Sequence, residues 1–159
     1  MIKLDRIDLK ILDILQRDAR STIKEIAGKL NLSTTPIFER IKRLEKAGVI
    51  DRYVAILNPT LLGKKLTAFI HISIKDHTKE SVEAFVERVV SFDEVIECHH
   101  VSGDSDFLLQ VLLEDIEKYN QFVMEKLSVV PNISKLESRF SLSVRKKTNL
   151  VYIQTGPAK

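Results

Sequence analysis

The spacing of apolar residues changes near residue 66, and this change divides the chain into a helical part and a part that contains strands. Before it, Ile7, Ile11 and Ile14 recur every three to four residues, as on one face of an amphipathic helix. From Ala68 to Ile74 apolar residues recur at every second position, which indicates a half-buried strand. The 159 residues are enough for two small domains. The sequence therefore predicts an α+β chain with domains at residues 1–59 and 60–159.

The first part predicts three short helices. Asp5 is a suitable N-cap for a helix over 5–17, and Thr22 with Glu25 forms a capping box for a helix over 23–30. Asn31 tolerates the left-handed backbone that a tight turn requires. A third helix follows, with Ser33 as its N-cap. Two helices joined this closely, over residues 23–46, predict a helix-turn-helix, a motif that places its second helix in the DNA major groove.

The third helix has an apolar inner face at Ile37, Ile41 and Leu44 and a hydroxyl-rich, basic outer face. Its first half is expected to approach base edges, and its later cations are expected to hold phosphates. Arg40 lies nearer the buried flank, where it forms either a structural ion pair or a phosphate contact. The predicted DNA-binding residues are Ser33, Thr34, Thr35, Glu39, Arg40, Lys42, Arg43 and Lys46.

Charge supports this prediction. Residues 1–59 carry 12 Lys and Arg against 8 Asp and Glu, whereas residues 60–159 carry 13 against 14. The basic excess therefore lies in the same part of the chain as the predicted recognition helix, as is typical of nucleic-acid binding. The alternative is a plain three-helix bundle whose charged face is only solvated.

The second part predicts the order βαββαβ, which is the ferredoxin-like arrangement. A linker strand at 49–57 precedes it. Its predicted elements are strands from residue 66, at 95–101, at 107–113 and around 136–142, helices at 79–91 and around 116–127, and a short fifth strand at Leu150–Ile153. The strand at 107–113, FLLQVLL, is apolar on both faces, although helices cover only one face in this arrangement. A second cover is needed, so the sequence predicts a homodimer.

Several classes of protein are excluded or disfavoured. The single cysteine, Cys98, excludes an internal disulfide and suits a reducing cytoplasm. No apolar run approaches the length that spans a bilayer, about 20 residues. His99 and His100 are adjacent on a strand, point to opposite faces and cannot together chelate one metal ion. No catalytic triad or phosphate loop is present, so we expect neither an enzyme nor a cofactor or metal site.

Four blocks of the chain resemble the Lrp/AsnC (feast/famine) family of bacterial and archaeal transcription regulators. They are LDRIDLKILDILQRDAR, EIAGKLNLSTTPIFERIKRLEKAGVIDRYVAILNP, VIECHHVSGDSDFLLQV and VRKKTNL. The resemblance implies a winged-type helix-turn-helix domain, a strand linker that pairs with its mate in a dimer, and a ferredoxin-like regulatory (RAM) domain. It also implies dimers that assemble to octamers, a palindromic double-stranded DNA operator and a cytoplasmic, nucleoid-associated location.

The same resemblance assigns an effector site to the loop from Ser102 to Asp106. In the family, small effectors, usually amino acids, bind near the matching loop at the interface between dimers. A glycine lets backbone approach a ligand, and a carboxylate pairs with an ammonium group. The expected effector-binding residues are Ser102, Gly103, Asp104 and Asp106, completed by Ser138 and Arg139. The alternative is a tight hairpin whose aspartates only shape the turn.

Two other functions are compatible with the sequence. Some relatives of the family are haem-precursor decarboxylases that use histidines and basic residues, and His99 with His100 is the only adjacent histidine pair here. A chromatin-like protein that coats DNA without any effector is the other reading.

Overall fold

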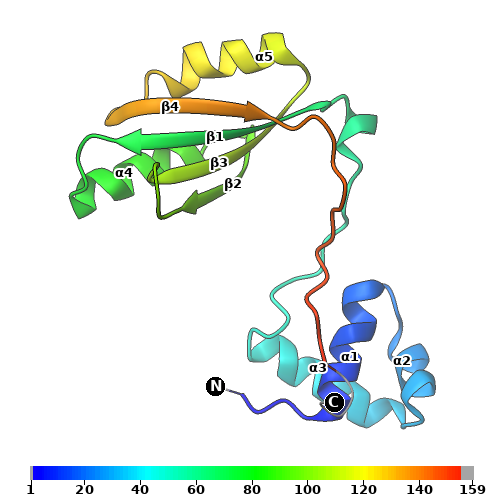
Figure 1. The fold of residues 1–159 in the computed structure, drawn as a ribbon. Coiled ribbons are helices and arrows are strands. Elements are labelled where there is room, and N and C mark those ends of the chain that lie inside the picture. The colour runs from blue at the N-terminus through cyan, green and yellow to red at the C-terminus, as the bar shows by residue number, and fades with distance from the viewer. Residues whose placement is uncertain (1, 155–159) are drawn as a thin grey trace. The chain divides into compact units, whose positions relative to one another are not determined.

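The computed structural model describes residues 2–154, which divide into two compact units (Figure 1). The first unit comprises residues 2–56 together with 146–154, and the second comprises residues 57–145. No described helix is long and apolar enough to cross a membrane.

The first unit contains three helices, α1 (Arg6–Arg17), α2 (Ile23–Leu30) and α3 (Thr34–Lys46). The two predicted helix starts with side-chain caps are confirmed: Asp5 and Thr22 each form a capping box with the residue three positions on. A single core joins the helices, and its buried members are Ile11, Leu15, Ile26, Ala27, Ile37, Ile41 and Leu44. The helix-turn-helix predicted over residues 23–46 is therefore present.

Ser33 is the N-cap of α3 by position, but its side chain makes no capping hydrogen bond. The reason is the residue three positions after Ser33. A capping oxygen accepts from the backbone N–H of the second or third helical residue. Pro36 is the third helical residue here and has no N–H. The start of α3 therefore leaves the Ser33 hydroxyl uncommitted among the described residues.

The turn between α2 and α3 depends on Asn31, whose φ of 53° and ψ of 47° are left-handed. We expect Asn31→Ala to lower the free energy of unfolding by about 1 kcal/mol, because a residue with a Cβ and no local polar group is strained in this region. Asn31→Gly is the matched control and should stay within about 0.5 kcal/mol of the parent protein. Urea unfolding measures both, and an unchanged Asn31→Ala midpoint would contradict the argument.

The second unit confirms the predicted order βαββαβ. A 3₁₀ turn at Pro59–Leu62 precedes it. The elements are β1 (Leu66–Ile74), α4 (Lys79–Val90), β2 (Val95–His100), β3 (Phe107–Leu113), α5 (Ile116–Gln121), which continues as a π-helical turn over Phe122–Leu127, and β4 (Ile133–Phe140). The four strands form one antiparallel sheet in the order β2-β3-β1-β4, with β1 and β3 at its centre (Figure 1).

Alternation along β1 and β3 separates the two faces of this sheet. Every second residue of both strands is buried in one core with Phe85 and Val89 of α4 and with Phe122 and Leu127 of the second helical segment. We call the other side the open face. Phe69, Leu108 and Leu112 lie on it and are half-buried within this chain. Cover of this face by a second subunit stays a prediction.

Two predicted strands are absent from the described chain. Residues 51–58 form no strand, so pairing of the linker with a partner subunit stays a prediction. The fifth strand predicted at Leu150–Ile153 is wrong, because this segment is not a strand. The Val151 N–H instead donates to Gln16 Oε1 of α1 at 3.0 Å. The segment from residue 146 accordingly belongs to the first unit, whereas the sequence alone predicts it in the second.

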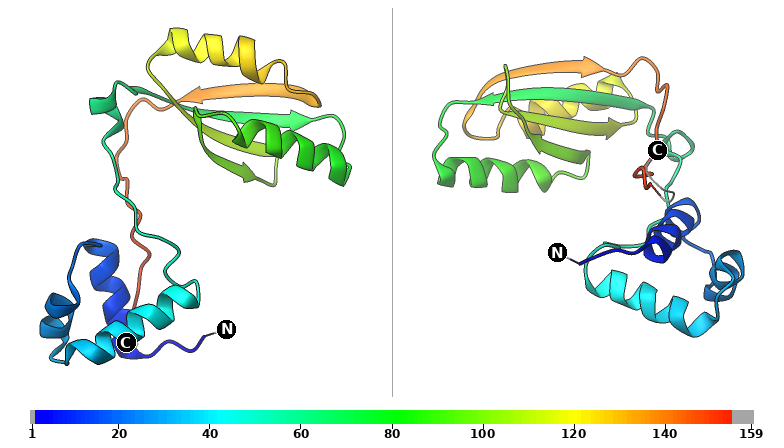
Figure 2. Two further views of the ribbon diagram at one scale, coloured as in Figure 1. Left: turned by 180° about the vertical axis from the view of Figure 1, so that it is seen from behind. Right: turned by 60° about the horizontal axis from the view of Figure 1, so that its bottom comes forward.

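Figure 2 shows from two further sides that the chain passes twice between the units, once after α3 and once after β4. A short apolar run such as that from Leu150 to Ile153 indicates that the segment packs against another element, but not against which one. Here side chains of α1 and of residues 49–56 border the same hollow as Val151 and Ile153.

Candidate nucleic-acid interface and ligand site

The outer face of α3 is free to meet a partner. The inner residues Ile37, Ile41 and Leu44 are 0%, 9% and 0% exposed. The predicted DNA-binding residues that are exposed are Ser33, Thr34, Thr35, Glu39, Lys42, Arg43 and Lys46. Hydroxyls lie at the start of this face and cations along its second half, as the helical period predicts.

The start of α3 suits a phosphate group. Its first N–H groups have no side-chain cap, and the Ser33 hydroxyl lies beside them. Exposed N–H groups and the positive end of the helix dipole together attract anions. Hydroxyls are common donors to DNA phosphates, so this end of the helix can bind a phosphate group of the DNA backbone.

Two lysines of the outer face differ in their surroundings. Lys42 Nζ lies 3.0 Å from Glu45 Oε2 and 5.9 Å from the ring centroid of Phe38. Both contacts are exposed, so they are weak and screened by salt. Lys46 is exposed and makes no ion pair with a described residue. Both ammonium groups are therefore available to phosphates.

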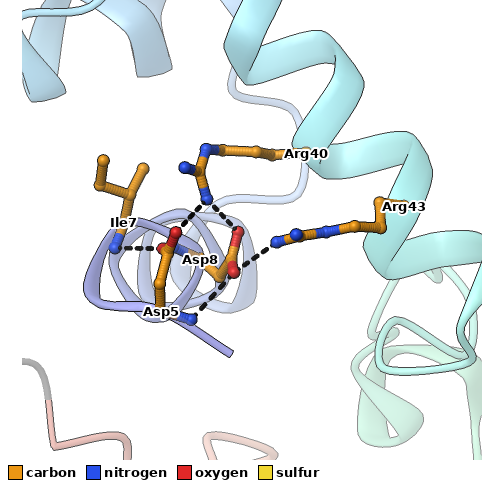
Figure 3. A network of polar contacts seen from close by, with 5 residues as sticks. All are labelled: Asp5, Ile7, Asp8, Arg40 and Arg43. Atoms are coloured by element: carbon orange, nitrogen blue, oxygen red, sulfur yellow. Dashed lines mark hydrogen bonds and ion pairs between the residues drawn. The ribbon is translucent and has the colours of Figure 1, made fainter. Parts of the chain in front are cut away.

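Arg40 and Arg43 enter a network with the first turn of α1 (Figure 3). Arg40 Nη1 donates to Asp5 Oδ2 at 2.6 Å and to Asp8 Oδ1 at 2.7 Å. Arg43 Nη2 donates to Asp8 Oδ2 at 2.5 Å. Of the two alternatives for Arg40, the structure shows the ion pair. The Asp8 N–H and then the Arg40 guanidinium lower the pKa of Asp5 below its usual value.

The second unit carries a hollow of about 400 Å³ on its open face. Its walls come from β1, β3, β4 and the loop before β3. The lining residues are His71, Ser73, Val101, Ser102, Asp104, Ser105, Leu108, Lys135, Glu137 and Arg139. Both signs of charge are present, because Lys135 and Arg139 line the hollow together with Asp104 and Glu137.

The structure separates the six residues predicted for effector binding. Ser102, Asp104 and Arg139 line the hollow. Gly103 lies in the loop with a φ of 121°, which suits a residue without a side chain. Ser138 does not line it: it pairs with Ile70 on the helix-covered face and meets the Tyr119 hydroxyl. Ser138 and Arg139 point to opposite faces of β4, because consecutive strand residues alternate, so only Arg139 borders the hollow.

Asp106 holds the loop rather than lining the hollow. Its carboxylate accepts from the Ile74 N–H at 2.9 Å and lies 3.0 Å from His77 Nε2. Its own N–H donates to Ile72 O at 2.9 Å. The Ile74 N–H and then His77 lower the pKa of Asp106. Asp106 therefore fixes the end of the loop to β1.

Sequence reasoning missed seven residues of the hollow: His71, Ser73, Val101, Ser105, Leu108, Lys135 and Glu137. The signal that could have found most of them is the two-residue period. Lys135 and Glu137 share a face with Arg139, and the pairing of β1 with β4 sets His71 opposite Glu137. Arg139 and then Lys135 lower the pKa of Glu137, and the nearer contact, Arg139 Nη2 to Glu137 Oε1, is 3.0 Å.

The remaining histidines carry no site of their own. His99 Nε2 lies 3.0 Å from Glu97 Oε2, and the ring of His100 stacks on Phe107 with centroids 4.8 Å apart. They point to opposite faces of β2, as predicted, because His99 pairs with Leu108 and His100 with Phe107.

Comparison with known proteins matches both units. A profile described as "Winged helix-turn-helix DNA-binding" matches residues 4–51, and one described as "Lrp/AsnC ligand binding domain" matches residues 67–151. The leucine-responsive regulatory protein of Rhizobium meliloti is 38% identical over 141 residues, 89% of this chain and 90% of that protein. The protein of the same name from Escherichia coli is 36% identical over 152 residues, 96% of this chain and 93% of that protein.

Solved structures agree over nearly the whole chain. A transcriptional regulator from Neisseria meningitidis, solved as a complex with L-Met, has a TM-score of 0.90 and 34% identity, covering 94% of this chain and 97% of that one. An AsnC family transcriptional regulator from Agrobacterium tumefaciens has a TM-score of 0.89 and 38% identity, with the same coverage.

Proposed function

The chain belongs to the Lrp/AsnC family of transcription regulators, and from this premise we propose how its two units divide the work. The family makes it a DNA-binding transcription regulator with a ligand-binding domain and not an enzyme. The proposal is that the outer face of α3 reads a palindromic operator as part of a homodimer, that an amino acid in the hollow modulates this binding, and that the protein works at the nucleoid in the cytoplasm.

The DNA-binding part of the proposal is supported by the division of α3 into a buried apolar face and an exposed face of hydroxyls and cations. Ser33 to Glu39 are the residues for base edges and the first phosphate. Lys42 and Lys46 are residues for phosphates, which set the register of the helix on the duplex. A dimer would present two such helices to successive major grooves.

The hollow on the open face supports an amino-acid effector. A zwitterion needs a cation for its carboxylate and an anion for its ammonium group, and the hollow supplies Arg139 and Lys135 with Asp104. Leu108 adds an apolar wall for a side chain. The bound L-Met of the Neisseria relative and the name of the leucine-responsive relatives point to a small apolar amino acid. Assembly into octamers through this region belongs to the same proposal.

The decisive experiment is a binding titration of the protein against DNA from its own upstream region and against a random duplex of equal length. At about 150 mM salt we expect at least a 10³-fold preference for the specific site. We also expect the logarithm of affinity to fall linearly with the logarithm of salt concentration. Equal affinity for the two duplexes would overturn sequence-specific binding and favour a protein that only coats DNA.

Effector identity is tested on the same preparation by thermal melting against the twenty amino acids. A ligand that binds only the folded protein raises the melting midpoint. A rise with one or two small apolar amino acids is expected, and its absence with all twenty would overturn the amino-acid part of the proposal.

A further inference from the structure

Arg43 lies on the outer face of α3, yet one of its N–H groups is taken by a carboxylate of another helix. Its Nη2 donates to Asp8 Oδ2, and its side chain remains 47% exposed. A guanidinium has five N–H donors in a rigid planar fork. Arg43 can therefore hold Asp8 with one edge and offer its other donors outward.

The carboxylate of Asp8, unlike the Arg43 guanidinium, is held in the interior of the unit. It is 0% exposed, and each of its carboxylate oxygens is in use. Oδ1 accepts from Arg40, whereas Oδ2 accepts from Arg43 and from the Asp5 N–H at 3.0 Å. A buried carboxylate is costly without such partners. The contacts that hold Asp8 are drawn in Figure 3, and together they fix the side of the network that belongs to α1.

We propose that Asp8 is a positioning residue for DNA binding: it holds the Arg43 guanidinium so that its free N–H groups meet a phosphate of the operator. The inference rests on the proposed function, because it takes α3 as the DNA-binding helix. A shallow hollow beside the guanidinium, bordered by Pro36, Glu39, Arg40 and Arg43, gives a phosphate oxygen room to approach. A long side chain ordered before binding loses less conformational freedom when the complex forms.

The arrangement of charges favours a role in which Asp8 positions Arg43 over one in which Asp8 competes with DNA for Arg43. Asp5 and Asp8 balance Arg40 and Arg43 in number, but both carboxylates lie at the start of α1. The dipole of that helix adds roughly half a positive charge there, which offsets part of their charge. Asp8 is also buried, whereas Arg43 is half exposed, so an arriving phosphate meets the guanidinium first.

A double-mutant cycle tests this with the full-length protein: parent, Asp8→Asn, Arg43→Gln and the double variant. Operator affinity is measured by fluorescence anisotropy at 20 °C over a range of salt, and folding by circular dichroism. We expect Arg43→Gln to weaken binding about 10-fold and to lower the salt slope by about one, the value of one phosphate contact. Asp8→Asn should weaken binding several-fold in the parent and by less than twofold in the Arg43→Gln background.

Two outcomes overturn the proposal. Equal losses from Asp8→Asn in both backgrounds would make Asp8 a structural residue only, whatever its effect on the melting midpoint. Tighter operator binding by Asp8→Asn would mean that the carboxylate competes with DNA for Arg43. Absence of specific binding by the parent protein would instead overturn the proposed function.

A second variant pair decides the question if Asp8→Asn does not fold. Arg43→Lys keeps the charge at an exposed position but loses the fork that serves two anions at once. We expect it to lose most of the affinity that Arg43→Gln loses. Lys75→Arg is the matched control at an exposed position of the second unit and should change affinity by less than twofold. Parent-like binding by Arg43→Lys would overturn the proposal.

Discussion

Replacing Lys42 and Lys46 together with glutamate should weaken operator binding on the order of 100-fold. Two phosphate partners are lost, and two repulsive charges face the DNA backbone. The salt slope should fall by about two, since each neutralised phosphate contributes about 0.9. Anisotropy titrations against the specific duplex at several salt concentrations measure both quantities.

The fold should survive this change, because both side chains are exposed. Acidic residues near the end of a helix oppose its dipole, so a loss of up to about 1 kcal/mol in the free energy of unfolding is expected. Lys75→Glu with Lys79→Glu is the matched control: both lysines are exposed, and they lie in the second unit. A similar loss of affinity in the control would show a general charge effect and contradict the assignment to α3.

Replacing Arg139 with glutamine should remove most of the stabilisation by the effector. A ligand at 100 times its dissociation constant stabilises the parent protein by about 2.7 kcal/mol. Loss of a charged hydrogen-bond partner costs about 1.5–3 kcal/mol, or roughly 10- to 100-fold in affinity. The stabilisation at the same ligand concentration then falls to about 0.4–1.4 kcal/mol. Thermal melting with and without the active amino acid measures this.

Ser138→Ala is the control variant for Arg139→Gln. Ser138 is adjacent in sequence, but its hydroxyl meets Tyr119 on the covered face of the sheet. Its replacement should lower the melting midpoint of the free protein slightly and leave the effector-induced rise intact. Loss of the rise in Ser138→Ala with its retention in Arg139→Gln would show that the ligand lies elsewhere than the hollow.

Local signals predicted the helices and strands well because the interactions that start and end them lie close in sequence. In capping their helices, Asp5, Thr22 and Asn31 each act within three or four residues of their own position. The two-residue period of β1 and β3 is likewise a local property. The order of the elements is compatible with few sheet topologies, and the observed sheet has the predicted ferredoxin-like one.

The features that sequence reasoning missed depend on partners far along the chain. Arg43 was assigned to phosphates from its helical angle, whereas its contact to Asp8 spans 35 residues. The anchoring of Val151 to Gln16 spans 135 residues. The expectation that Ser138 and Arg139 of the fourth strand lie together in one pocket overlooks strand alternation, which directs neighbouring side chains to opposite faces. Which element covers an apolar or charged face is a tertiary property that no local pattern contains.

The return of residues 146–154 to the first unit makes the ligand-binding unit an insertion in topological terms. Residues 2–56 and 146–154 both belong to the first unit, and residues 57–145 form the second unit between them in sequence. Cleavage in the connection after β4 would leave the units joined through residues 51–58. A fragment that stops at Ile56 would lack Val151 and Ile153, which border the same hollow as residues of α1. The first unit, as the contacts define it, therefore combines two separate segments of the sequence.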